Sequence, residues 1–165
     1  MPSNDTGILI LPGEGKTVSF SGTTFSGNQV RFVYGEPHST YSLVEWVAAP
    51  GAPGTPLHLH RATDEAFYFL KGTFGFQVGH RTLELTAGAF IFVPKGLEHA
   101  FWNEGTTPAK LLSTVSPPGF EWYFEELADG LTAVGDDAEA AMSLRRALSE
   151  KYDIEVVGPP RQATG

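Results

Sequence analysis

Three histidines and one glutamate in the middle of this chain have the spacing of metal ligands. His58 and His60 flank one residue, Glu65 follows five positions later, and His99 begins a later segment. A strand alternates its side chains between two faces, so two residues separated by one project from the same face. Two neutral imidazoles on one face can supply half of a metal site. The sequence therefore predicts that His58 and His60 bind a metal ion together.

A tight hairpin is expected to bring Glu65 back beside the two histidines. An apolar, aromatic run of strand character begins at Glu65, and only a short polar stretch separates it from His60. His99 follows the turn 94–96, in which a proline fixes φ and a glycine accepts positive φ. A mixed nitrogen and oxygen donor set suits one divalent ion of Fe, Mn, Ni, Co, Cu or Zn, with two open positions in an octahedral shell. The expected metal ligands are His58, His60, Glu65 and His99.

These residues, with the glycines and prolines around them, resemble the two motifs of the cupin superfamily. The first motif continues to Gly72, and the second, from Gly88 to Asn103, matches at every position. One departure is Ala52, where the family pattern has a glycine; Gly51 and Gly54 lie on either side of it. The resemblance covers residues 40–116 and implies an all-β fold, the cupin double-stranded β-helix or jelly-roll barrel.

The length and composition agree with one sheet-rich domain. The chain has 165 residues, and its 19 glycines and 12 prolines separate short aromatic and β-branched runs. We expect extra N-terminal strands over 1–39, the barrel over 40–116, one or two helices over 117–157 and a tail over 158–165. The expected strands lie at 7–11, 16–25, 29–34, 40–49, 55–60, 65–71, 73–78, 81–85, 89–93, 98–103 and 108–116.

After residue 117 the apolar period changes from two to about 3.6, which indicates helices. One apolar face comprises Phe120, Tyr123, Phe124 and Leu127, and a second comprises Ala141, Leu144, Leu148 and Tyr152. Asp136, with Glu139 three residues later, is the expected N-cap of the second helix. These helices could cover the outside of the barrel, or the aromatic stretch 120–124 could roof its mouth.

Strand alternation also predicts the character of the cavity. If the first three ligands face inward, then so do Phe67 and Phe69, and His99 brings Phe101 with it. The expected substrate pocket is lined by Phe67, Phe69, Phe101, Phe120 and Phe124. Such a pocket suits a planar or apolar ligand with the metal as its polar anchor. In the alternative interpretation, these phenylalanines only fill the core.

Other polar residues near the motifs have simpler interpretations. His38 and His80 lie in turns, where an exposed histidine is common. Asp64 is expected on the opposite face from Glu65, and Lys95 and Glu98 border a turn, so all three are predicted to face solvent.

Composition excludes several classes of partner. The chain has no cysteines, hence no disulfides or thiolate ligands. Its net charge of −8 and lack of a basic cluster argue against nucleic acid. Its apolar runs are too short to cross a bilayer, and no signal peptide is visible, so we expect a cytoplasmic protein whose partner is a small molecule.

The resemblance extends to a subgroup. Pro118 and Gly119 followed by the phenylalanine-rich stretch 120–124 look like the quercetinase-like dioxygenases. This implies a metal-dependent dioxygenase acting on an aromatic or enolic small molecule, with Glu65 as both ligand and catalytic base. A metal-dependent isomerase, cyclase or decarboxylase and a non-catalytic binding cupin stay open as alternatives. The resemblance also implies a homodimer.

Overall fold

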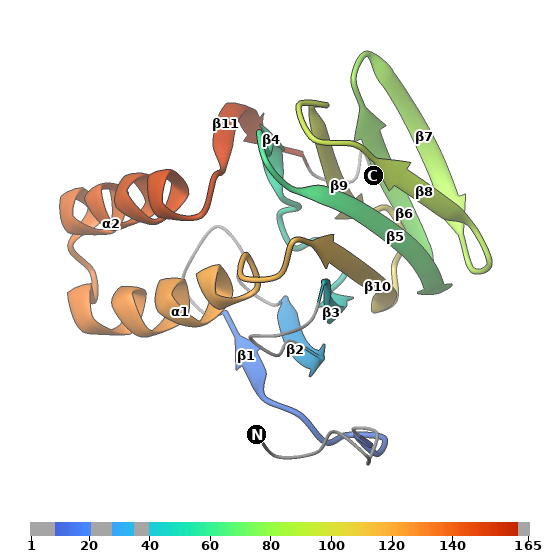
Figure 1. Ribbon diagram of the computed structural model, residues 1–165, viewed down its shortest axis with the longest axis horizontal. Helices are drawn as coiled ribbons and strands as arrows, with labels where there is room; N and C mark the ends of the chain where they lie inside the picture. Colours follow the sequence, from blue (N-terminus) through green and yellow to red (C-terminus); the bar gives the residue numbers. More distant parts are fainter. Residues whose placement is uncertain (1–8, 21–27, 35–39, 162–165) are drawn as a thin grey trace.

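Short alternating segments pair into two antiparallel sheets that face each other (Figure 1). The computed structural model describes residues 9–20, 28–34 and 40–161. In order, the six-stranded sheet comprises β1 (Thr17–Ser19), β2 (Gln29–Tyr34), β3 (Ser42–Ala48), β10 (Ala109–Ser116), β5 (Asp64–Lys71) and β8 (Phe90–Val93). The five-stranded sheet comprises β11 (Glu155–Pro160), β4 (Pro56–Leu59), β9 (His99–Asn103), β6 (Thr73–Val78) and β7 (Arg81–Thr86).

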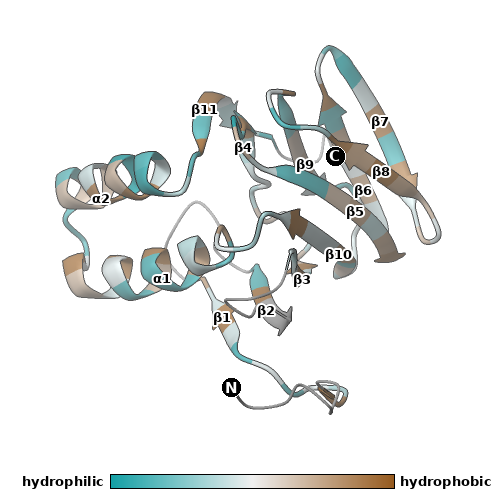
Figure 2. Ribbon diagram, viewed as in Figure 1, coloured by the Kyte–Doolittle hydropathy of each residue, from teal (hydrophilic) through white to brown (hydrophobic). Residues whose placement is uncertain are grey.

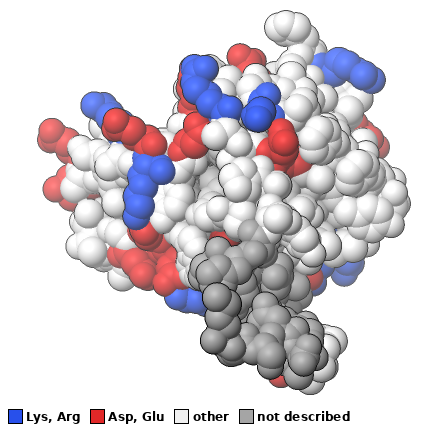
Figure 3. All heavy atoms as spheres, viewed as in Figure 1, with Lys and Arg blue, Asp and Glu red and all other residues white. Residues whose placement is uncertain are grey.

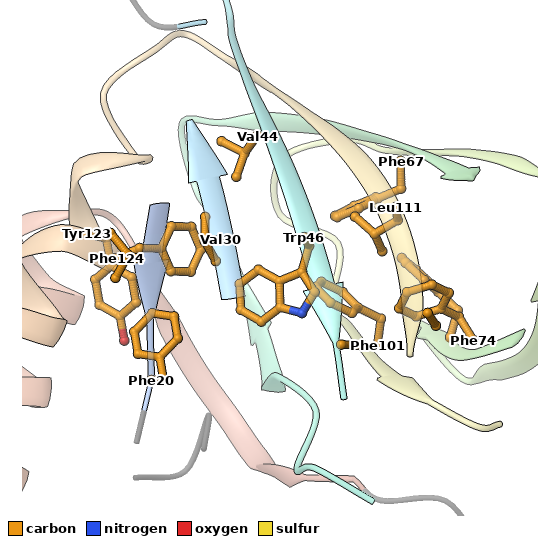
Figure 4. Close-up of a cluster of buried hydrophobic side chains, with 14 of the residues drawn as sticks. Phe20, Val30, Val44, Trp46, Phe67, Phe74, Phe101, Leu111, Tyr123 and Phe124 are labelled. Atoms are coloured by element: carbon orange, nitrogen blue, oxygen red, sulfur yellow. The ribbon is translucent and has the colours of Figure 1, made fainter. Parts of the chain in front are cut away.

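The strands alternate as a half-buried sheet requires, and the resulting core is aromatic (Figure 4). On β5, Phe67 and Phe69 are buried while Tyr68 and Leu70 between and after them are exposed. Trp46 packs edge-to-face on Phe101, with ring centroids 5.3 Å apart, and so ties the two sheets together. Figure 2 shows apolar positions alternating with polar ones along the strands. The two facing antiparallel sheets confirm the predicted double-stranded β-helix.

Two antiparallel helices lie beside the barrel, α1 (Trp122–Val134) and α2 (Ala138–Lys151) (Figure 1). They pack closely at Gly130, where an added Cβ would lie 2.6 Å from a methyl carbon of Leu144. The N-cap of α2 is Asp137 instead of the predicted Asp136: its carboxylate accepts hydrogen bonds from the backbone N–H groups of residues 139 and 140. A capping side chain must directly precede the first helical residue to reach these donors, and Asp137 occupies that position.

The two ends of the chain differ from the expectations. Of the expected strand 7–11, residues 9–11 form no strand, and residues 7–8 lie outside the described residues. Of the expected strand 16–25, the structure shows β1, and residues 21–25 lie outside the described residues. The predicted tail from residue 158 is wrong up to Pro160, because β11 pairs with β4 there. Two prolines are compatible with this strand because it is at the edge of its sheet.

The loop that enters β4 is fixed by close contact with β9. An added Cβ at Gly54 would lie 2.3 Å from the carbonyl oxygen of Phe101, so only glycine fits. The backbone N–H of Thr55 donates to that same carbonyl at 3.0 Å. Ala52 is buried in this loop, so the departure from the motif is accommodated by Gly51, with its φ of 70°, and by Gly54.

The outer face of β5 and β8 is apolar. Tyr68, Leu70, Phe90 and Phe92 are all between 41% and 63% exposed. In Figure 3 much of the surface to the right of centre carries few charged side chains. Within the described residues, no helix has both the length and the apolar character needed to cross a membrane.

Candidate metal centre

The four predicted ligands come together at one buried point inside the barrel. His58 lies on β4, His60 just after it, Glu65 on β5 and His99 on β9. One nitrogen or oxygen atom from each lies within 4.8 Å of those from the other three. All four residues are buried.

Hydrogen bonds to backbone carbonyls orient all three imidazoles in the same way. The Nδ1 atom lies 2.8 Å from the Pro56 oxygen in His58, 2.9 Å from the Asp153 oxygen in His60 and 3.1 Å from the Leu97 oxygen in His99. A carbonyl oxygen only accepts, so each Nδ1 must donate. In a neutral ring the Nε2 atom then carries a free electron pair, and Nε2 is the atom directed at the cluster.

The donor atoms lack protein hydrogen-bond partners of the kind that buried polar atoms require. Among the described residues, the Nε2 atoms of His60 and His99 and Oε2 of Glu65 are buried without such a partner. Oε2 lies 2.7 Å from Nε2 of His99 and 3.6 Å from Nε2 of His60. Two electron-pair donors as close as Oε2 of Glu65 and Nε2 of His99 must share a cation, either a proton or a metal ion. The donor set therefore fits one divalent metal ion.

Mutual interactions shift the proton affinities within the cluster. Burial lowers the pKa of His58 to about 3, and the charges of His99 and His60 act in the same direction. Burial alone would raise the pKa of Glu65, but the charge and hydrogen bond of His99 outweigh it and lower the pKa to about 2. Burial opposes protonation of His99, yet the Glu65 carboxylate raises the pKa of His99 above its ordinary value. Without metal, the Glu65 carboxylate therefore favours a proton on His99.

A small cavity lies against the cluster, with about 50 Å³ available to the centres of water molecules. That is room for a few waters. Of the five phenylalanines predicted to line a pocket, Phe67, Phe101, Phe120 and Phe124 do so. Phe69 does not line this cavity; it packs in the core against Phe74 and Phe76, with ring centroids 5.3 and 6.1 Å away.

The aromatic stretch before and within α1 covers the mouth of the barrel. The Phe120 ring meets the His60 ring edge-on at 4.7 Å between centroids, and it meets Phe124 at 5.3 Å. Buried Glu121 holds this segment in place, since its carboxylate accepts hydrogen bonds from the Ser42 hydroxyl at 2.8 Å and from the Gly119 N–H at 2.6 Å. Of the two arrangements considered for this stretch, the structure shows the roof.

Three residues of the site do not stand out in the sequence. Ser113 and Tyr123 bring hydroxyl groups to the cavity. Asp153 orients His60 through its carbonyl, and its carboxylate accepts a hydrogen bond from the Ala62 N–H at 2.7 Å. Ser113 could have been found as a polar residue at an inward position of β10. Asp153 carries no such signal, because it contacts His60 from a distant part of the chain.

The remaining polar candidates lie away from the cavity. His80 and Lys95 are exposed and Glu98 is half-buried, while His38 lies outside the described residues. Asp64 was expected to face solvent and make no contact with the protein. It is instead half-buried and accepts a hydrogen bond from the Lys95 N–H at 2.8 Å. This hydrogen bond therefore stabilises the turn that precedes His99.

Two curated proteins show sequence similarity to the chain. Quercetin 2,3-dioxygenase from Bacillus subtilis (strain 168) is 29% identical over 103 residues, which cover 61% of this chain and 29% of that protein. The tetracenomycin polyketide synthase protein TcmJ from Streptomyces glaucescens is 30% identical over 69 residues, or 42% of this chain and 46% of that protein. The chain spans less than two thirds of the length of the curated relatives it matches.

Solved structures and a family model agree on the fold. An RmlC-like cupin from Shewanella frigidimarina superposes with a TM-score of 0.59 at 24% identity, covering 71% of this chain and 96% of that one. The polyketide cyclase RemF from Streptomyces resistomycificus gives 0.59 at 21% identity, covering 67% and 80%. A family model described as a cupin domain matches residues 44–115, which include all four clustered residues. Residues 44–115 therefore resemble a cupin domain, and the chain is built as a double-stranded β-helix with a buried cluster of three histidines and one glutamate.

Proposed function

We propose that this protein is a metal-dependent dioxygenase that acts on an aromatic or enolic small molecule. One observation carries the proposal: three imidazoles with Nδ1 held by backbone carbonyls direct Nε2, together with the Glu65 carboxylate, at one point beside an aromatic cavity. The ligands of the proposal are His58, His60, Glu65 and His99. A bound divalent ion would supply Lewis acidity and, if redox-active, a site for dioxygen chemistry.

The substrate class follows from the cavity and from one relative. Four phenylalanine rings line the cavity together with Trp46 and Tyr123, so a planar aromatic group would displace water favourably there. Quercetin, named in the Bacillus subtilis relative, is a planar enol of this kind. The cavity has room for only a few waters, so a substrate of that size requires neighbouring side chains such as Phe120 to move outward.

Glu65 is proposed to accept the proton of the substrate hydroxyl. Its pKa of about 2 keeps the carboxylate ionised at neutral pH, so it can accept a hydrogen bond from the substrate hydroxyl. The Ser113 hydroxyl and the Tyr123 phenol lie on the cavity and can hold other oxygen atoms of the substrate. The roof residue Phe120 would exclude water while the substrate is bound.

An oxygen-independent reaction, such as cyclisation, isomerisation or decarboxylation, is the second candidate. The similarity to a tetracenomycin polyketide synthase protein favours it, because polyketides are also enolic and aromatic. In a third alternative, the domain only binds such molecules. Dioxygen consumption separates the first candidate from the other two, and conversion of the compound without dioxygen separates the second from the third.

The test begins with metal content, measured by mass spectrometry on protein purified without a histidine tag. We expect about one equivalent of a transition metal and dioxygen uptake when quercetin is added. Glu65→Gln should lower turnover by about 100-fold or more, whereas Glu84→Gln, on the exposed face of β7, should leave it unchanged. Protein that takes up no metal even after reconstitution would show that the domain is not a metal enzyme.

We also propose that the chain forms a homodimer through the outer face of β5 and β8. This face exposes Tyr68, Leu70, Phe90 and Phe92, and β8 is the end strand of its sheet. A second copy can add the same edge and cover the same apolar face, as an interface with twofold symmetry requires. Light scattering should give twice the mass of one chain, and Phe90→Lys with Phe92→Lys should halve it. A monomeric wild type would contradict the proposal.

A further inference from the structure

A groove between α2 and β11 adjoins the cavity beside the four clustered residues. About 750 Å³ in it is available to the centres of water molecules, far more than in the cavity itself. The groove and the cavity share four lining residues, Pro56, Tyr123, Ile154 and Val156. A ligand whose ring lies against the metal cluster can therefore extend into the groove.

Two arginines of α2, Arg145 and Arg146, line this groove. Arg145 is half-buried; one of its terminal nitrogens donates to the Ala141 carbonyl at 3.4 Å, and its Nε atom is buried without a hydrogen-bond partner among the described residues. A buried guanidinium nitrogen without a partner is costly, and an acceptor from a ligand would satisfy it.

The acidic residues of the groove leave these arginines available. Glu155 forms an ion pair with Arg61, and Glu150 is exposed on α2. In the described part of the chain neither Arg145 nor Arg146 lies within ion-pair distance of a carboxylate. The whole chain has a net charge of −8. Two guanidinium groups on one groove without a carboxylate partner among the described residues are therefore a local exception to its negative charge.

Tyr123 lies where the groove meets the cavity. Burial raises the pKa of Tyr123 to about 12, although the positive charge of Arg145 opposes that shift. The phenol is therefore protonated at neutral pH. It can donate a hydrogen bond to the same ligand that Arg145 contacts.

We propose that the groove binds a carboxylate carried by the substrate, with Arg145 as its main contact, Arg146 as a second cation and Tyr123 as a hydrogen-bond donor. A guanidinium group matches a carboxylate through two parallel hydrogen bonds, which an uncharged amide cannot reproduce. The substrate class is thus an aromatic or enolic carboxylic acid. This inference rests on the proposed function, because the ring of the same molecule occupies the cavity beside the metal.

The test compares two probes that differ only in charge, 4-hydroxycinnamate and 4-hydroxycinnamide, by calorimetry on metal-loaded protein. We expect wild-type protein to bind the acid at least about tenfold more tightly than the amide, as expected for a charge-assisted contact. Arg145→Gln should remove this preference and leave amide affinity unchanged. Arg145→Lys should retain part of the preference, and Arg81→Gln, at the exposed start of β7, should retain all of it.

Metal content measured on the same samples separates this inference from the proposed function. Equal affinity for the two probes, absence of binding by both, or a preference that survives Arg145→Gln would overturn the carboxylate groove, even with one metal ion bound per chain. Loss of the metal site would instead appear as protein without metal, whatever the ratio between the probes.

Discussion

His58 and His99 lie directly opposite each other on the neighbouring antiparallel strands β4 and β9, and their ring centroids are 4.3 Å apart. Cross-strand pairing therefore brings together the two sequence motifs of the chain at the cluster of candidate ligands. Neither ring can move without disturbing the other strand.

Replacing either member of this pair should release the metal. His99→Ala or His58→Ala removes a nitrogen ligand, and we expect metal affinity to fall by more than about 100-fold, since even loss of a residue that only supports a ligand costs 10- to 100-fold. Metal content after dialysis measures this. His80→Ala, at an exposed turn, is the control. A variant of His58 or His99 that keeps a full equivalent would refute the ligand assignment.

Metal affinity should fall with acidification. The pKa of His99 is raised by Glu65, so this ring begins to take up a proton above the ordinary value of 6.5, and that proton competes with the metal for Nε2. Below the pKa of His99, its protonation alone weakens binding about tenfold per pH unit. The pKa values of Glu65 and His58, about 2 and about 3, keep both free of protons in this range. Competition titrations between pH 8 and pH 5 that show constant affinity would contradict this assignment.

Asp153 should matter for metal binding although it is not a ligand. Asp153→Ala removes the acceptor of the Ala62 N–H and destabilises a residue that has a φ of 56°. The carbonyl that orients His60 would then shift, and we expect a 10- to 100-fold loss of metal affinity. Asp153→Asn should retain most of the affinity, because asparagine tolerates positive φ and keeps an oxygen acceptor. Asp129→Ala, exposed on α1, should have no effect.

Gly54 should be intolerant of any side chain. Its missing Cβ makes room for the Phe101 carbonyl, and the backbone cannot yield there without breaking the 3.0 Å hydrogen bond from the Thr55 N–H. We expect Gly54→Ala to lower the free energy of unfolding by about 1–3 kcal/mol, measured by urea denaturation. Gly105→Ala is the matched control, because its Cβ would be 3.4 Å from the nearest atom. Equal losses in the free energy of unfolding for the two substitutions would contradict the prediction that a side chain at Gly54 is too crowded.

The barrel was expected from the resemblance to the cupin motifs, whereas local rules accounted for the faces of the strands on which the ligands lie. Alternation on β4 and β5 placed His58 and Glu65 on the inner face, and the turn at 94–96 reversed the chain before His99. Alternation alone also suggested Phe69 for the pocket, but depth along the strand decides which inward residues reach a cavity. Phe69 lies farther from the cavity along β5 than Phe67, and its ring packs against Phe74 and Phe76.

Features that depend on distant pairing could not be predicted in this way. Gly158 and the two prolines after it are typical of a loose end, and only the presence of β4 as a partner makes them a strand. The interaction of Asp153 with His60 likewise depends on the path of the chain after α2. Asp136 and Asp137 are adjacent and chemically alike, so the choice of N-cap depends on where α2 begins.

The pairing of β11 with β4 has a consequence for biosynthesis. Residues 155–160 pair with β4, the strand that carries His58, and the Asp153 carbonyl orients the ring of His60. The ligand set therefore depends on a segment that the ribosome adds long after the ligands themselves. A nascent chain that has emerged only as far as β10 has all four ligands but lacks the support that aligns them. Metal loading is therefore expected to follow synthesis of the helices and β11, which would make it a late step in the maturation of the protein.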